Sequence, residues 1–105
     1  MKKTLKTNGN SWQLYLSKPI IQLLGISDKE YTVLLTIENK ILTVRRIDKT
    51  NIKKFENLLT KKLIKRSSGY GLNLSLPILE LLDINPEIDM LDINVEGDKL
   101  IISKA

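Results

Sequence analysis

The chain has 105 residues, of which 42% are hydrophobic, and 17 Lys and Arg against 12 Asp and Glu give it a net charge of +5. This length suits one domain or two very small ones, and no apolar run approaches the roughly 18 residues of a membrane-spanning helix. Cysteine and histidine are both absent, which excludes disulfides, zinc sites built on thiolate or imidazole, and Ser/His or Cys/His catalytic pairs.

The start, MKKTLKTNG, has two lysines with no apolar stretch behind them, so it is no signal peptide and we expect a cytoplasmic protein. Charge is unevenly spread along the chain. Residues 1–50 carry a net charge of +5, residues 51–66 another +5, and residues 67–105 carry −5. A basic half followed by an acidic half indicates a polarised surface, and a basic face is typical of nucleic-acid binding.

The first predicted elements occupy residues 1–46. KTLKTN is a short basic strand, and WQLYLS alternates apolar and polar residues with the period of a half-buried strand. SKPIIQLLGI predicts a two-turn helix with Ser17 as its cap, an apolar face of Ile20, Leu23 and Leu24, and Gly25 at its C-terminal cap. YTVLLTIENKILTVRR then predicts two strands around a tight turn at Asn39-Lys40.

A connector follows at residues 49–63. Its apolar residues recur at spacings of three and four, with lysines on the other side, which predicts an amphipathic helix capped by Asp48 or Thr50. A flexible linker is the less favoured interpretation, because the segment lacks Gly and Pro.

The remaining residues, 64–105, repeat the first set of elements. An offset of 58 places Pro19 on Pro77 and Leu14 on Leu72, and it also pairs Trp12 with Tyr70. SLPILELLDINP repeats the helix, and IDMLDINVEGDKLIISKA repeats the hairpin, where Gly97 lengthens the offset to 59. The chain therefore divides into a first repeat (1–48), a connector (49–63) and a second repeat (64–105), each repeat of ββαββ type.

One repeat alone has too few residues to shield both faces of a sheet. We therefore expect the two copies to interleave into one mainly β domain, a small closed barrel. Trp12 and Tyr70 share the phase of Leu14 and Leu72, so we expect their rings to pack in the core.

The repeats resemble the swapped-hairpin domain of the SpoVT/AbrB superfamily, which includes the MazE-type antitoxins. The resemblance is carried twice, by KTNGNSWQLYLSKPIIQLLGI and by SLPILELLDI with EGDKLII. It implies a DNA-binding body made from two copies that exchange hairpins, here a single-chain pseudo-dimer, with a further homodimer open. The family often carries an arginine on the outward side of the second strand, where this chain has Tyr15 and Asn73.

By the resemblance, the contacts to double-stranded DNA come from the first strand, the turn and the outward side of the second strand. In this sequence those residues are Lys6, Asn8, Asn10, Ser11, Gln13 and Tyr15 in the first copy, and Lys65, Arg66, Ser67, Ser68 and Asn73 in the second.

Two functions remain open. The first is a DNA-binding transcriptional regulator, an autorepressor at operator DNA. The second is an antitoxin-like subunit that neutralises a toxin protein. We expect no cofactor, no metal and no catalysis, because the acidic residues of the second half are not accompanied by a nucleophile or a set of metal ligands. These residues, Glu80, Asp83, Glu87, Asp89 and Asp92, are interpreted as a solvated face that could also recognise a basic partner.

Overall fold

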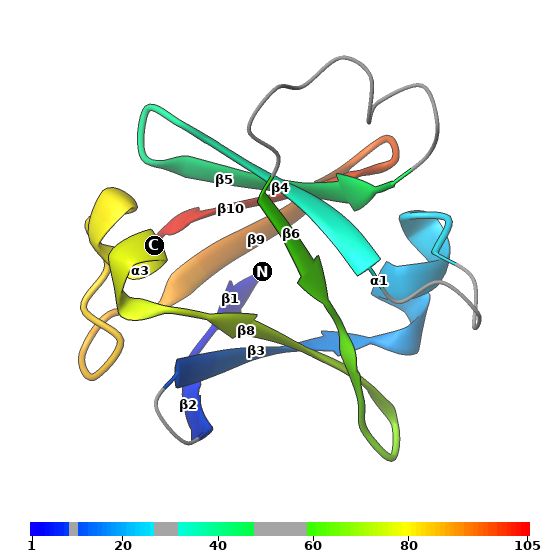
Figure 1. Cartoon of the computed structure of the whole chain (residues 1–105), viewed down its shortest axis with the longest axis horizontal. Helices are drawn as coiled ribbons and strands as arrows, with labels where there is room; N and C mark the ends of the chain where they lie inside the picture. The colour runs from blue at the N-terminus through cyan, green and yellow to red at the C-terminus, as the bar shows by residue number, and fades with distance from the viewer. Residues whose placement is uncertain (9–10, 27–31, 48–58) are drawn as a thin grey trace.

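Two antiparallel sheets make up most of the computed structural model, which describes residues 1–8, 11–26, 32–47 and 59–105 (Figure 1). The six-stranded sheet has the spatial order β1 (Lys2–Lys3), β9 (Leu91–Glu96), β10 (Lys99–Lys104), β5 (Ile41–Arg46), β4 (Thr32–Glu38), β6 (Leu59–Lys62). The four-stranded sheet has the order β2 (Lys6–Asn8), β3 (Ser11–Ser17), β8 (Gly69–Leu74), β7 (Ile64–Lys65). Two short helices, α1 (Lys18–Leu23) and α3 (Leu76–Leu81), follow β3 and β8. The predicted mainly β class is confirmed.

Strands β3 and β8 form the centre of the four-stranded sheet, and they pair in a reciprocal way. Leu14 lies opposite Leu72, its own counterpart in the sequence repeat, while Trp12 lies opposite Leu74 and Leu16 opposite Tyr70. This is the register of two equivalent strands related by a local twofold at the Leu14–Leu72 pair. Leu14 and Leu72 are fully buried, Tyr70 is buried, and Trp12 packs against the core, so the predicted strand phase is confirmed.

The two hairpins lie side by side in the six-stranded sheet, where β5 pairs with β10. The β4–β5 turn places Asn39 and Lys40 at φ values of 52° and 64°, and the β9–β10 turn places Gly97 at 62°. Positive φ at the tip of a tight hairpin matches the right-handed twist of the strands. Both predicted turns are confirmed.

The edge strands connect the halves of the chain. β1 joins β9 in the second half, with Lys3 opposite Leu91, and β6 joins β4 in the first half, with Lys61 opposite Val33. Val33 and Leu91 are counterparts in the sequence repeat. β1 and β6 are therefore equivalent edge strands, and each of them pairs with a strand from the other half of the chain. After each edge strand the chain crosses to the four-stranded sheet, and a leucine is buried at each crossing, Leu5 and Leu63.

The predicted closed barrel and the predicted helical connector are both corrected. The core lies between two separate sheets, because the chain leaves the six-stranded sheet at Leu5 and at Leu63 instead of continuing its hydrogen-bond ladder around a barrel. Residues 59–62 form β6 and not the end of a helix. Leu59, Lys61 and Leu63 alternate with exposed residues, so the same leucines also fit the period of a strand. The rest of the predicted helix, and both of its candidate caps, lie outside the described residues.

Each helix has a proline as its second residue, Pro19 or Pro77, and packs one face on the core. In α1 the buried residues are Ile20, Ile21 and, just after the last turn, Leu24, whereas Leu23 is 60% exposed, so its predicted place on the buried face is wrong. Ser17 lies at the N-cap without a side-chain hydrogen bond to the helix. Gly25 has φ 73°, as its predicted C-terminal cap requires, and Asp83 takes the same conformation after α3 at φ 58°. In the described ranges, no helix has the length and apolar character to cross a bilayer.

Candidate nucleic-acid interface

The outward face of β3 and β8 lies at one end of the molecule, opposite the end formed by β5 and β10 (Figure 1). Alternation along the two strands sends Leu14 and Leu72 into the core and leaves Gln13, Tyr15 and Asn73 half-buried on the outer face. The sequence assigned all three of these outer residues to DNA contact by resemblance. The fold brings them together from both halves of the chain.

Gln13 is at the centre of a hydrogen-bonded row on this face. Its side-chain Nε2 donates to Oδ1 of Asn73 at 2.9 Å, and its Oε1 accepts from Nε of Arg66 at 3.0 Å. The amide is therefore held on both sides, by the paired strand and by the turn after β7. The bond from Arg66 uses Nε and not the two terminal nitrogens of the guanidinium, which can approach an anion as a planar pair.

Tyr15 fixes the turn that leads into β8. Its hydroxyl donates to the backbone carbonyl of Ser68 at 2.8 Å and lies 2.9 Å from the Ser68 hydroxyl. The backbone N–H of Arg66 donates to the carbonyl of Gly69 at 2.8 Å, which closes the same turn. These bonds place Arg66 beside Gln13, although the two residues are 53 positions apart.

Two glycines of β8, Gly69 and Gly71, complete the face, and neither is among the residues predicted from the sequence to contact DNA. A Cβ at Gly69 would overlap the carbonyl oxygen of Leu16 and lie 2.7 Å from the Tyr15 hydroxyl, and a Cβ at Gly71 would overlap the side chain of Gln13. Tyr15 and Gln13 of β3 thus lie over the two glycines of β8, and Asn73 is the outer residue of β8 that carries a side chain. Glycine inside a strand indicates such a close approach, and the GYG stretch was the available signal.

A pocket of about 220 Å³ opens on this face beside β2. It is lined by Thr4, Lys6, Gln13, Tyr15 and Arg66. Lys6 is opposite Gln13 in the register of β2 and β3, so it lies on the same face, and both Lys6 and Arg66 are exposed. Two cations with hydroxyl and amide donors around a small hollow form a place where a phosphate group can be held.

The remaining predicted residues lie elsewhere around the sheet. Lys65 is opposite Tyr70 in the register, on the side that turns toward the core, so it does not share the face of Lys6 although it is exposed. Ser67 and Ser68 are exposed in the turn, and Ser11 is half-buried at the start of β3. The backbone of Asn8 ends β2. Asn10 lies outside the described residues.

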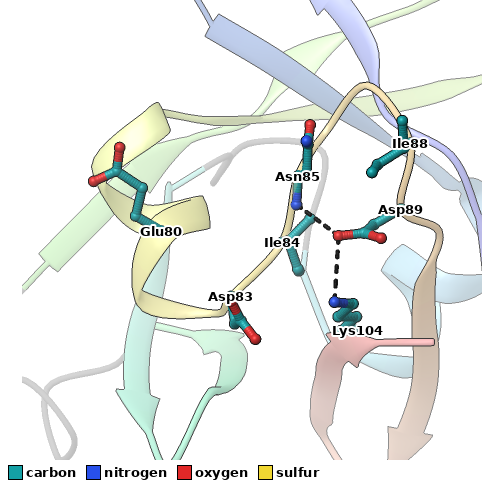
Figure 2. A pocket seen from close by; sticks show the side chains of 7 residues that line it. All are labelled: Glu80, Asp83, Ile84, Asn85, Ile88, Asp89 and Lys104. Carbon is teal, nitrogen blue, oxygen red and sulfur yellow. Dashed lines mark hydrogen bonds and ion pairs between the residues drawn. The ribbon is translucent and has the colours of Figure 1, made fainter.

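A second pocket, of about 360 Å³, lies between α3, the loop that follows it and β10 (Figure 2). Asp89 is the best connected of its acidic side chains: it accepts from the backbone N–H of Asn85 at 2.7 Å and lies 3.6 Å from Nζ of Lys104. Figure 2 shows the carboxylates of Glu80 and Asp83 pointing away from Asp89 rather than converging with it. In the part of the chain that the structure describes, acidic residues form no cluster able to hold a metal ion. Asp89 thus ties the loop to β10.

Comparison of the chain with protein-family models, with curated proteins and with solved structures finds no match in any of the three. The geometry of the outward face of β3 and β8 is therefore the basis for a functional assignment.

Proposed function

We propose that this protein is a cytoplasmic, non-enzymatic DNA-binding regulator, an autorepressor of the swapped-hairpin SpoVT/AbrB type that acts as a single-chain pseudo-dimer. The observation that carries the proposal is the row Arg66–Gln13–Asn73, which joins predicted contact residues of both halves on one outward face. The reciprocal pairing of β3 with β8, and the exchange of β1 and β6 between the halves, support the swapped-hairpin arrangement.

The chemistry of the face suits a duplex. Lys6 and Arg66 can pair with phosphate oxygens, and such contacts set the position of a protein on DNA without reading its sequence. The amides of Gln13 and Asn73 can hydrogen-bond to base edges, which is how sequence is read directly. The face thus combines cations that raise the affinity for any DNA with amides that can distinguish one base sequence from another.

The test is a fluorescence anisotropy titration with labelled duplex from upstream of the gene and with a scrambled duplex, each at two salt concentrations. Phosphate contacts release counterions, so we expect a log–log salt slope of about −3 to −5 for the few cations available. Lys6→Ala should weaken binding to both duplexes, whereas Gln13→Ala should reduce the preference for one over the other. Lys99→Ala is the matched control, because Lys99 is an exposed lysine at the start of β10 in the six-stranded sheet, away from the outward face of β3 and β8.

A second candidate function is the antitoxin-like one, in which the main partner is a protein. It is favoured by apolar side chains exposed on and after α3, where Leu81 is 61% and Ile88 77% exposed. Absence of binding to either duplex at low salt would contradict DNA binding and favour this candidate, for which Leu81→Ser should then weaken binding to a toxin protein.

A further inference from the structure

The candidate interface has a twofold backbone but not a twofold set of side chains. The backbone of β3 and β8 is arranged reciprocally about Leu14 and Leu72. On the outer face, however, Gln13 corresponds by the repeat to Gly71, and Tyr15 corresponds to Asn73. The large side chains of β3 cover the glycines of β8, so the first half supplies Gln13 and Tyr15 where the second half supplies Gly71 and Asn73.

The cations are distributed with the same asymmetry. Lys6 lines the pocket beside β2, and its counterpart Ile64 is an apolar, half-buried residue opposite Gly71. Arg66 comes from the second half but is bonded to Gln13 of the first, so it contributes to the same pocket. Both cations are thereby gathered near the first half's outward residues, whereas their repeat counterparts, Ile64 for Lys6 and Asn8 for Arg66, carry no charge.

A binding face with true twofold symmetry presents the same groups to both halves of a palindrome. We propose that this face binds its DNA in one fixed orientation, on a non-palindromic site, with a backbone phosphate held between Lys6 and Arg66 on one side only. The inference rests on the proposed function and specifies the class of DNA that it takes. Gln13, held between Asn73 and Arg66, is the residue that determines specificity on the same side.

Site-directed DNA cleavage tests the orientation, because the chain contains no cysteine and a single one can carry an iron chelate. Thr7→Cys and Lys65→Cys place the cutter at repeat counterparts, on β2 and on β7, and both positions are exposed. The DNA is a duplex selected by the wild-type protein from a random library. In a fixed orientation the two cutters lie on opposite sides of the local twofold, so they should cleave at different positions of the selected duplex.

Identical cleavage patterns from the two variants would overturn the inference, because they mean that the protein binds in both orientations equally. This criterion applies to one bound chain per duplex, because two chains related by a twofold on a palindrome would also give two different patterns. If no duplex from the library binds, the proposed function itself is contradicted. This failure is seen at the selection step, before any cleavage is measured, so it is distinct from failure of the orientation proposal.

A symmetrised variant provides a second measurement. Gln13→Gly combined with Tyr15→Asn gives β3 the outer residues of β8 at both positions. If the asymmetric side chains of β3 contribute to the orientation, the difference between the two cutters should be reduced in this background, while binding to the duplex remains because Lys6 and Arg66 are unchanged. An unchanged difference in a variant with native circular dichroism would contradict the assignment of orientation to these side chains.

Discussion

At Gly69, the addition of a single methyl group should destabilise the folded state. A Cβ there would overlap the backbone carbonyl of Leu16, and the backbone of a paired strand cannot rotate aside as a side chain can. We expect Gly69→Ala to lower the free energy of unfolding by about 1–3 kcal/mol, as overpacking of a well-packed site does. Urea denaturation followed by circular dichroism measures the loss.

The control for this prediction is Gly71→Ala in the same strand. The atoms that a Cβ would meet there belong to the end of the Gln13 side chain, which can rotate away at the expense of its hydrogen bonds. Gly71→Ala should therefore cost less stability than Gly69→Ala, and the reverse order would contradict the packing described for this face.

Asp83 has a left-handed backbone conformation, with φ 58°. The first repeat has a glycine, Gly25, at the corresponding position, where φ is 73°. Left-handed φ strains residues that carry a Cβ, so Asp83→Gly should raise the free energy of unfolding by on the order of 0.5–1 kcal/mol. Its ion pair with Lys40, at 3.9 Å and largely exposed, contributes little against this gain. Gly25→Asp is the matched exchange and should lower the melting temperature; a shift of the same sign for both variants would refute the explanation.

At the scale of elements, the phase of β3 and β8 decides which side chains stabilise the fold and which are available to a ligand. Leu14→Ala and Leu72→Ala should each cost about 2–5 kcal/mol, because both leucines are fully buried at the local twofold. Tyr15→Phe removes only an exposed hydroxyl with its bonds to Ser68 and should cost about 0.5–1.5 kcal/mol. Denaturant melts compare the three, and a loss at Tyr15 as large as that at Leu14 would mean that the strand phase is wrong.

At the scale of the whole molecule, the first half of the chain depends on the second for its strand partners. β1 pairs with β9, β3 with β8, β4 with β6 and β5 with β10. A fragment of residues 1–50 would leave these edges unpaired and the core leucines exposed, so we expect it not to unfold cooperatively as a monomer. Sedimentation together with urea melts makes the measurement. A fragment that is monomeric and has a sigmoidal melt would show that one repeat can form its own core.

The sequence by itself determined features that depend on neighbours along the chain. Alternation placed Leu14 and Leu72 inside and Tyr15 outside, and turn residues such as Asn39 located the hairpins, because strand period and positive φ are local properties. The internal repeat also indicated that the two halves depend on each other. Within the candidate interface, the outward positions Gln13 and Asn73 followed from the same alternation joined to the family resemblance.

Only the tertiary structure decided what depends on distant partners. The spacing of Leu59 and Leu63 fits a helix or a strand equally well. The segment is a strand because its backbone pairs with β4. The face that α1 buries, which excludes Leu23, was set by the sheets against which the helix packs. The meeting of Arg66 with Gln13, and the glycines beneath the side chains of β3, arise from contacts across the two halves. The period of a strand or helix can be read from neighbouring residues along the chain. Which strands pair with one another depends instead on how much apolar surface the whole fold buries.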